Sequence, residues 1–354
     1  MKILYYGPIT PIGLPSKGGY EAANRKIIDK LREKSIQVIE FANPQINKRL
    51  GFIGKLAYIK LFFTPLCLFK YLGNKNIIIH TTPLYGNLLL PSLFLIFIAN
   101  ILKIHCLVDI RAGSLIHYYK TKGKYKQFLL KCMIKYADRI TVEGFSYIRD
   151  IKEIMKLDVT IDYLPNVALC TDIKYTEREF SKINIFYFGR ITLSKGIDIL
   201  LNMMDFLDNN YHLYLAGPIS NDIKCEDLSS DKITYLGVLT PQQLNETMKK
   251  MHFFVFPSKH IGEGQSNALI EAMANGLVPI TSNQGFNAEV VKDCGVILNN
   301  YATGKDYAEK ILSINSNRWK GLSIKSRNHI FKYHNIDIEI NKLIDIYKQL
   351  LINE

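Results

Sequence analysis

Apolar and polar residues alternate in blocks that predict strands followed by helices along most of the chain. Short β-branched and aromatic runs predict strands in the second half, at residues 183–188, 211–216, 232–235 and 253–256. Near the start, the run KILYY predicts a strand, and apolar residues at helical spacing predict a helix over residues 20–34. Strands that alternate with helices are typical of parallel sheets, so the predicted fold class is α/β.

Residues 84–102 carry no charge, and this stretch approaches the ~20 apolar residues needed to cross a bilayer. Pro91 and Asn100 interrupt it, and two strand-like runs, IIIH and KIHCLVDI, flank it. These features favour a buried helix in a strand–helix–strand unit over a membrane span.

The length of 354 residues suits two domains of about 150–200 residues each. The six cysteines are scattered, with neither a C-x-x-C pair nor the spacing of a zinc site. The first residues, MKILYYGPIT, lead directly into a strand and lack the basic and small-residue features of an export signal. A cytoplasmic location is the expectation that follows.

The segment FFVFPSKHIGEGQSNALIEAMANG carries two carboxylates, Glu263 and Glu271, around a change from apolar strand to polar loop to helix. Ser266 or Asn267 can cap this helix, and Gly276 can end it in the left-handed conformation. Because neither cap is followed three residues later by a glutamate, Glu271 is not part of a capping box. Glu271 either complements the helix dipole, or both carboxylates accept hydrogen bonds from a hydroxyl-rich ligand whose anionic part lies at the helix start.

A second segment, INIFYFGRITLSKGIDILL, places Arg190 and Lys195 in the loop between a strand and a helix. Two cations at the carboxyl end of a strand can neutralise a diphosphate, the arginine as a planar fork and the lysine as a point charge. Solvated loop cations are the alternative, and spacing alone leaves both interpretations open.

Together the two segments resemble the retaining, nucleotide-sugar-dependent glycosyltransferases of the GT-B fold, of the group-1 (family 4) type that assembles bacterial polysaccharides and glycolipids. The resemblance covers nearly the whole chain. In that family a Gly-Arg followed by a Lys-Gly binds the donor diphosphate, and the matching residues are Gly189, Arg190, Lys195 and Gly196. The family's Glu-x7-Glu element is matched by Glu263 and Glu271.

The resemblance implies two Rossmann-like parallel-sheet domains that face each other across a cleft. It also implies that Glu263 faces the hydroxyls of the donor sugar and that Glu271 holds the ribose. The backbone that approaches the sugar and phosphate would be that of Gly264, Gln265, Ser266 and Asn267. Gly18 and Gly19, just before the first helix, match a Gly-Gly loop that the family uses over the donor phosphates.

Pro165-Asn166 resembles the chain break that closes the first domain in this family. The expected domains are an N-terminal, acceptor-binding domain over residues 1–168 and a donor-binding domain over residues 169–335. A final helix in residues 336–354 is expected to pack back on the first domain, as in relatives.

One position departs from the family's pattern. Relatives often carry a histidine beside the transferred sugar, and this chain offers Asp109, in the run VDIRAGS, instead. Asp109 can orient an acceptor hydroxyl or balance charge at the reacting centre, whereas a salt bridge to Arg111 or a loop cap is the alternative. His105, in the preceding run, is expected to be a strand residue rather than a catalyst.

Charge is distributed unevenly along the chain. Residues 1–170 hold 25 Lys and Arg against 11 Asp and Glu, while the remainder holds 20 against 21. A basic stretch that includes Lys55 and Lys60 is interleaved with apolar residues, which suits an anionic leaflet, although a solvated helix face over a core gives the same pattern. With Arg111, these lysines are the expected contacts to acceptor or membrane. No zinc finger, RNP signature or helix-turn-helix accompanies the charge, so nucleic acid is not an expected partner.

The predicted function is transfer of a hexose-type sugar from a nucleoside diphosphate sugar, UDP rather than GDP, to a hydroxyl of a glycan or glycolipid acceptor. A growing lipid-linked polysaccharide, O-antigen of lipopolysaccharide or capsule precursor is the expected acceptor, which places the protein at the inner face of the cytoplasmic membrane. The predicted catalytic residues are Glu263, Arg190, Lys195 and Asp109. Two cations and a helix terminus can replace a magnesium ion, and no Asp-x-Asp motif is seen, so neither a metal nor a cofactor is expected. A nucleotide-sugar epimerase of GT-B shape and a catalytically silent, membrane-associated protein are the alternatives.

Overall fold

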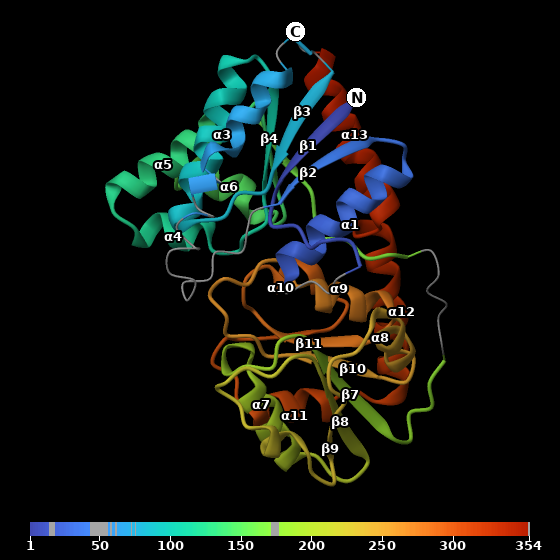
Figure 1. The fold of residues 1–354 in the computed structure, drawn as a ribbon. Coiled ribbons are helices and arrows are strands. Elements are labelled where there is room, and N and C mark those ends of the chain that lie inside the picture. Colours follow the sequence, from blue (N-terminus) through green and yellow to red (C-terminus); the bar gives the residue numbers. More distant parts are fainter. Residues whose placement is uncertain are drawn as a thin grey trace. The chain divides into compact units, whose positions relative to one another are not determined.

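The computed structural model describes residues 1–13, 18–42, 56, 59–60, 62–71, 73–74, 76–170 and 177–352. The chain divides into two compact units (Figure 1). Unit 1 is Met1–Pro165 together with Ile336–Glu354, and unit 2 is Asn166–Asn335. The boundary between Pro165 and Asn166 falls a few residues before the one expected from the sequence, and the final helix belongs to unit 1.

Unit 1 is built on a six-stranded parallel sheet in the order β2-β1-β3-β4-β5-β6. Its strands are β1 Lys2–Gly7, β2 Gln37–Ala42, β3 Ile77–Thr81, β4 His105–Ile110, β5 Arg139–Val142 and β6 Ile161–Tyr163. The inner strands β1, β3 and β4 are almost entirely buried, as expected for a parallel sheet covered by helices on both faces. Because β1 lies between β2 and β3, the chain changes direction across the sheet there.

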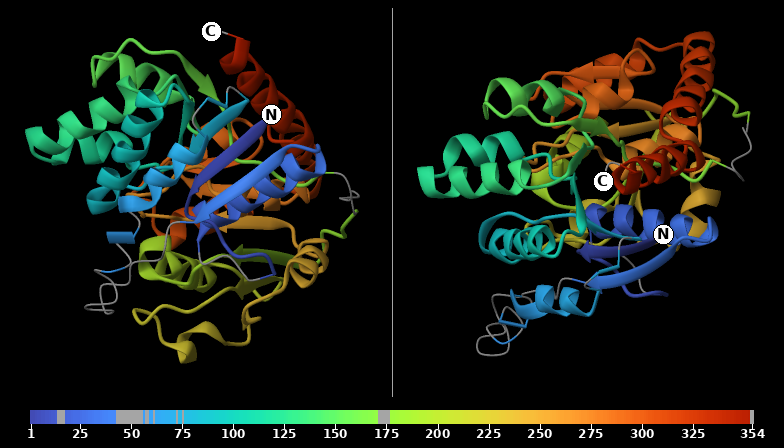
Figure 2. Two further views of the ribbon diagram at one scale, coloured as in Figure 1. Left: turned by 45° about the horizontal axis from the view of Figure 1, so that its top comes forward. Right: turned by 90° about the horizontal axis from the view of Figure 1, so that it is seen from above.

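The helices of unit 1 cover the two faces of this sheet. They are α1 Gly19–Glu33, α3 Leu89–Ile101, α4 Leu115–Thr121, α5 Lys124–Lys135, α6 Ser146–Glu153 and α13 Ile336–Ile352, with the 3-10 helices η2 Thr64–Tyr71 and η3 Gly86–Leu88. α1 packs beside α13, and Lys30 on α1 forms an ion pair of 3.0 Å with Asp337. Right-handed crossovers place α3 and α5 on the opposite face from α1, and α3 packs beside both η2 and α5 (Figures 1 and 2).

The uncharged stretch 84–102 contains η3 and α3, and it forms the helical part of a strand–helix–strand unit as predicted. The inner side of α3 is buried, but Leu90, Phe97 and Ile101 are 37%, 59% and 56% exposed. The expectation of a buried helix is therefore wrong for the outer face of α3. In the part of the chain that the structure describes, no helix combines the length and apolar character needed to cross a membrane.

Unit 2 is built on a second six-stranded parallel sheet in the order β12-β11-β10-β7-β8-β9. Its strands are β7 Ile183–Phe188, β8 Tyr211–Ala216, β9 Ile233–Tyr235, β10 Phe253–Phe256, β11 Val278–Ser282 and β12 Val296–Leu298. The predicted strands at 183–188, 211–216 and 253–256 are confirmed, and β9 begins one residue later than predicted. These strands were recognisable because buried parallel strands are almost unbroken apolar runs.

The helices of unit 2 are α7 Ile197–Met203, α8 Pro241–Met248, α9 Asn267–Ala274, α10 Asn287–Val291, α11 Gly304–Leu312 and α12 Ser316–Tyr333, with the 3-10 helices η4 Leu193–Lys195, η5 Met204–Phe206 and η6 Cys225–Leu228. The core of unit 2 is rich in aromatic rings on β7 and β10, and Tyr187 stacks on Phe254 at 6.4 Å. Trp319 on α12 closes this core and donates a hydrogen bond of 3.1 Å from its indole nitrogen to the His252 carbonyl.

The strand order of unit 2 creates a topological switch point between β7 and β10. From β7 the chain runs through α7 to β8 on one side, and from β10 it runs through α9 to β11 on the other. In open α/β sheets, ligands bind outside the carboxyl ends of the strands at such a point. The loops that follow β7 and β10 are therefore the first place to look for a site.

Candidate functional site

The predicted donor-site residues of unit 2 follow β7 and β10. The loop after β7 begins at Gly189 and Arg190 and ends with Lys195 in η4. The loop after β10 runs over residues 257–266 and carries Glu263. Because β7 and β10 are hydrogen-bonded neighbours, both loops leave the sheet at the switch point.

Direct backbone contacts hold the two loops together. The Lys259 N–H donates to the Ser194 carbonyl at 2.9 Å. Gly196 has a φ of 78°, and a Cβ at this position would approach the Pro257 carbonyl oxygen to 2.2 Å. Only glycine fits both the left-handed backbone and this close approach. The crossing places Lys195, the preceding residue, against the second loop.

Lys195 and Glu263 form an ion pair at this crossing. The Lys195 Nζ lies 2.5 Å from the Glu263 Oε2, and the two side chains are 19% and 8% exposed. Ser258 also donates its hydroxyl to this Oε2 at 2.5 Å. The Lys195 Nζ lies 5.5 Å from the centre of the Phe256 ring, which adds a cation–π contact. Within the described residues the Glu263 Oε1 has no hydrogen-bond partner, so it can accept a hydrogen bond from a ligand.

Arg190 is an exposed cation on a firmly held loop. Its carbonyl accepts a hydrogen bond of 2.7 Å from the Tyr187 hydroxyl. Further along the loop, the Asp222 carboxylate accepts from the Thr192 hydroxyl at 2.6 Å and from the Leu193 N–H at 2.9 Å. The Arg190 guanidinium itself makes no ion pair with any residue that the structure describes. It is therefore available to an anion, while its backbone is fixed.

The helix that follows the second loop is capped as the sequence predicts. Ser266, rather than Asn267, is the cap, and its hydroxyl accepts from the Leu269 N–H at 3.3 Å. Asn267 is the first helical residue, and Glu271 lies in the second turn, where it is half-buried. Gly276, with a φ of 76°, follows the end of α9 in the left-handed conformation, as predicted.

Gln265 anchors the loop, which the sequence did not indicate. Its side-chain Oε1 accepts from the Asn166 N–H at 2.9 Å, and its carbonyl accepts from the Asn166 side-chain amide at 2.8 Å. The Gly264 carbonyl accepts from the Phe286 N–H at 3.4 Å. Gln265 is only 4% exposed, so its side chain positions the loop between β10 and α9.

Two residues of the site were missed in the sequence. Ser258 is fully buried, and its carbonyl accepts from the Ser282 hydroxyl at 2.7 Å while its own hydroxyl binds Glu263. Burial and the neighbouring Lys195 lower the pKa of His260, whose carbonyl accepts from the Glu263 N–H at 2.9 Å. Their place in the chain could have identified them, because both residues lie in the loop that follows a buried strand at the switch point.

The remaining candidates lie in unit 1, where Asp109 belongs to a buried network. Asp109 is fully buried and accepts from Arg111 at 2.5 Å, from the Thr141 hydroxyl at 2.8 Å and from His80 at 3.3 Å. Burial opposes its ionisation, but Arg111 and His80 outweigh this and hold the pKa of Asp109 below its usual value. The salt bridge that was the alternative for Asp109 is therefore present.

This network corrects the expectation for Arg111. Its side chain is 1% exposed because the ion pair with Asp109 holds it inside unit 1. Arg111 as a membrane contact is therefore wrong. Lys60 is exposed, and Lys55 lies outside the described residues. Gly18 is the N-cap of α1 and Gly19 is its first residue, whereas both were expected just before the helix; residues 14–17 of the preceding loop are also outside the described part.

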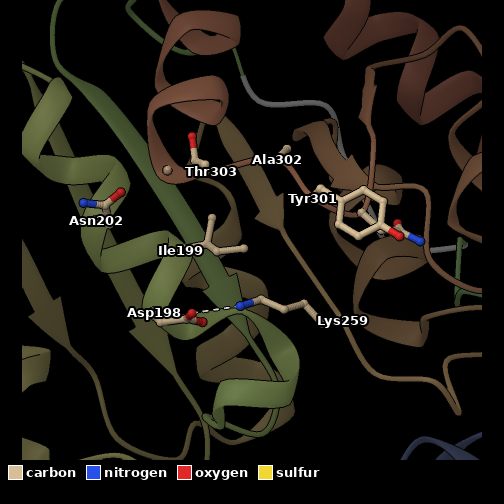
Figure 3. Close-up of a pocket in the computed structure, with 9 residues that line it drawn as sticks. Asp198, Ile199, Asn202, Lys259, Tyr301, Ala302 and Thr303 are labelled. Atoms are coloured by element: carbon tan, nitrogen blue, oxygen red, sulfur yellow. Dashed lines mark hydrogen bonds and ion pairs between the residues drawn. The ribbon is translucent and has the colours of Figure 1, made fainter.

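A pocket of about 400 Å³ opens in unit 2 between α7 and the segment before α11 (Figure 3). Asp198 and Lys259 form an ion pair of 2.8 Å on its wall, and Tyr301 is almost fully exposed at its rim. None of the predicted site residues lines this pocket. Lys259 is a useful reference cation, because it neighbours Ser258 in the chain and is bound to Asp198.

Residues 182–317 match the family model described as glycosyl transferases group 1. Unit 2 carries a group 1 glycosyltransferase domain. The matched range contains β7 and β10 and both loops of the site. It covers the part of the chain in which the Lys195–Glu263 pair and Arg190 lie.

Three curated relatives are similar to parts of this chain. Spore coat protein SA of Bacillus subtilis is 28% identical over 44% of this chain and 44% of its own length, so the chain spans less than half of that relative. An uncharacterized 41.2 kDa protein in the cps region of Klebsiella pneumoniae is 23% identical over 68% of this chain and 69% of its own. The GDP-mannose:cellobiosyl-diphosphopolyprenol alpha-mannosyltransferase of Xanthomonas campestris is 33% identical over 28% of each chain.

Solved structures show the fold of the whole chain. Sucrose-phosphate synthase from Thermosynechococcus elongatus has a TM-score of 0.78 at 16% identity, with both chains covered completely. HepE from Anabaena in complex with UDP has a TM-score of 0.73 at 12% identity, and covers 99% of this chain and 100% of its own. The chain therefore has the GT-B fold predicted from its motifs.

Proposed function

We propose that the protein is a retaining glycosyltransferase that moves a hexose-type sugar from a nucleoside diphosphate sugar to a hydroxyl of a growing, lipid-linked polysaccharide, O-antigen or capsule precursor. Unit 2 binds the donor and unit 1 the acceptor. The observation that carries the proposal is the arrangement at the switch point of unit 2. There, the Lys195–Glu263 pair of 2.5 Å lies at the crossing of the two loops, and the unpaired Arg190 lies at the start of the first of these loops.

The two cations suit the diphosphate of the donor. Negative charge develops on this group as the bond to the sugar breaks, and donors already fixed in place stabilise it at no cost in reorganisation. Arg190 offers a planar fork to two phosphate oxygens, and Lys195 has two N–H groups left after its bond to Glu263. With the N-terminus of α9 these groups supply the positive charge, so we propose that no metal ion is required.

The two carboxylates suit the hydroxyls on either side of the diphosphate. Glu263 is held by Lys195 and Ser258 on one oxygen, which leaves the other for a hydroxyl of the donor sugar. Glu271, in the second turn of α9, is proposed to hold the ribose. Retention of the anomeric configuration rests on the resemblance to this family and not on an identified nucleophile.

The relatives support the choice of donor and acceptor. HepE, which covers nearly the whole chain, was solved with UDP and with UDP-glucose, so we propose UDP rather than GDP as the carrier. The Xanthomonas relative acts on a diphosphopolyprenol-linked sugar, which supports a lipid-linked acceptor and a peripheral location at the inner face of the cytoplasmic membrane. The GDP-mannose donor of that relative makes GDP the natural comparison in any binding assay.

Binding of UDP, GDP and ADP by calorimetry tests the donor site. We expect UDP to bind, and we expect Arg190→Ala and Lys195→Ala each to weaken binding by about tenfold to a hundredfold, the loss of one charge-assisted hydrogen bond. Lys259→Ala is the matched control, because this lysine is bound to Asp198, and it should bind UDP like the parent. If UDP binding were weakened equally in all three variants, then only the overall positive charge would matter, and the proposed donor site would be wrong.

Product analysis separates transfer from the alternatives. A glycosyltransferase releases UDP only when a suitable acceptor is present. The Glu263→Gln variant should release no UDP even with that acceptor. An epimerase would convert the donor sugar with no acceptor, and a silent membrane-associated protein would release no UDP with any acceptor in a panel of polyprenyl-diphosphate-linked sugars.

A further inference from the structure

The outer side of unit 1 carries an apolar surface that the described residues leave uncovered. α3 has no charged residue in its 13 positions, and its exposed apolar residues, Leu90, Phe97 and Ile101, recur on one stripe at seven- and four-residue spacing. An ordinary surface helix places polar and charged residues on its outer face. α3 places Phe97 and Ile101 there, and both are more than half exposed.

The elements packed beside α3 also carry exposed aromatic residues. α3 contacts η2 on one side and α5 on the other, and the Asn100 side chain at the end of α3 donates to the Tyr136 carbonyl after α5 at 2.9 Å (Figures 1 and 2). Phe69 on η2 and Phe128 on α5 are 50% and 62% exposed. We call the following set the α3–α5 face: Phe69, Leu90, Phe97, Ile101, Tyr125 and Phe128.

The charge around this face is mostly positive, although Asp138, an exposed acidic residue, follows shortly after α5. Residues 41–137 contain 14 lysines and arginines and a single acidic residue, Asp109, which is fully buried against Arg111. No carboxylate from these residues is therefore exposed near the α3–α5 face. Among residues 41–137, the described lysines that are exposed are Lys60, Lys70, Lys103, Lys120, Lys122, Lys124, Lys126 and Lys135.

We propose that the α3–α5 face is the surface by which the protein docks on an anionic phospholipid bilayer. The inference builds on the peripheral membrane location proposed above, and it assigns that location to the described elements η2, α3 and α5. Aromatic and aliphatic side chains enter the boundary between headgroups and acyl chains, while the lysines meet the anionic headgroups. A helix of 13 residues is about 20 Å long, shorter than the hydrocarbon core, so α3 would lie along the surface.

Other occupants fit the observations less well. A nucleic acid would use the lysines and the aromatic rings, but it has no use for exposed aliphatic side chains such as Leu90 and Ile101. A second copy of this chain would bring the same lysines together, and like charges at an interface oppose association. The anionic bilayer is the partner that matches both the apolar character and the charge.

Vesicle co-sedimentation of the full chain tests the proposal. We expect binding to phosphatidylcholine vesicles that contain phosphatidylglycerol, at least about tenfold weaker binding to phosphatidylcholine alone, and a marked loss at high salt. Phe97→Gln/Phe128→Gln should weaken binding to the anionic vesicles about tenfold or more. The matched control, Phe206→Gln/Leu312→Gln, removes two exposed apolar residues of unit 2 and should bind like the parent.

Two further measurements keep the result unambiguous. Replacing Lys120, Lys122, Lys124 and Lys126 by glutamine should weaken binding without removing any apolar side chain. UDP affinity should be unchanged in every variant, so that a failure of docking is distinct from a failure of the donor site. Parent-like vesicle binding by both the Phe97→Gln/Phe128→Gln and the lysine variants would overturn the proposal, as would a dimer of the parent that Phe97→Gln/Phe128→Gln converts to monomer.

Discussion

At the scale of single residues, partners on distant segments position several of the polar side chains in the site. Lys195 and Glu263 were both predicted as ligands of the donor, but their contact with each other was not. They lie far apart in the sequence, and only the crossing of two loops brings the Lys195 Nζ to 2.5 Å from the carboxylate. The pair holds the two loops together, and we propose that it also binds the donor.

His252 shows how such partners set a pH dependence. It is 3% exposed, and burial is the main reason that its pKa is lowered. Its Nδ1 accepts from the Asn184 N–H at 3.0 Å, and its Nε2 donates to the Glu179 carbonyl at 2.8 Å. A proton on Nδ1 would break the bond to Asn184, so the folded protein keeps this ring neutral.

We therefore expect the free energy of unfolding to fall as the pH falls below about 6.5, the pKa of histidine in the unfolded chain. Between that pH and the lower pKa of the folded state, the unfolded chain binds a proton that the folded chain does not. The free energy of unfolding therefore falls by about 1.4 kcal/mol for each pH unit in this range. Urea unfolding at several pH values measures this change with pH. In His252→Gln, whose amide oxygen can still accept from Asn184, the change per pH unit should be smaller by the amount that one proton contributes. An unchanged pH dependence would show that His252 is not its source.

At the scale of elements, the sequence predicted strands better than surfaces. The runs that became β7, β8 and β10 were predicted residue for residue, because strands buried on both faces need apolar side chains at most positions. The cap at Ser266 and the stop at Gly276 were also predictable, since both depend on local backbone chemistry. The exposed face of α3 was not predictable, because an apolar helix pattern does not tell which side of the helix the sheet covers. The role of Ser258 was not predictable either, since a serine after a strand is common.

The crossing of the two site loops depends on one glycine, and the chain offers a matched control. Gly196 and Gly237 have nearly the same φ, 78° and 74°, but a Cβ at Gly196 would meet the Pro257 carbonyl oxygen at 2.2 Å, whereas a Cβ at Gly237 would meet nothing within 4 Å. We expect Gly237→Ala to cost about 1–2 kcal/mol from the left-handed backbone alone. Gly196→Ala should cost a further 1–3 kcal/mol or so, because the loops must move apart.

Chemical denaturation of the two variants measures this difference directly. Equal losses would show that backbone conformation explains the glycine at 196, and that the close approach of Pro257 does not constrain the site. A larger loss for Gly196→Ala would establish the loop crossing as a packed contact.

At the scale of the whole molecule, the path of the chain gives the two units different constructions. Unit 2 is one continuous segment, whereas unit 1 is completed by α13 from the end of the chain. Charge follows the same division, since unit 1 contains 27 lysines and arginines against 15 acidic residues and unit 2 contains 18 against 17. The basic character of the protein is therefore a property of unit 1, where we place the membrane surface.

The attachment of α13 to unit 1 includes one buried hydrogen bond that can be removed cleanly. The Tyr347 hydroxyl on α13 lies 2.6 Å from His80 Nδ1, and His80 Nε2 faces the Asp109 carboxylate at 3.3 Å. Burial lowers the pKa of His80, so the ring is neutral, gives its N–H to Asp109 and accepts the Tyr347 proton. Tyr347→Phe leaves Nδ1 buried without a donor, which should cost about 1–3 kcal/mol.

Hydrogen exchange resolves where that cost appears. We expect Tyr347→Phe to speed exchange in α13 and in the β3 and β4 peptides of unit 1, because local stability there depends on the lost bond. Tyr187→Phe is the reference, since it removes the hydrogen bond of 2.7 Å to the Arg190 carbonyl and should act on the unit 2 sheet instead. If both variants raised exchange evenly over the two units, then the chain would unfold as one cooperative body, and α13 would stabilise unit 2 as much as the unit it completes.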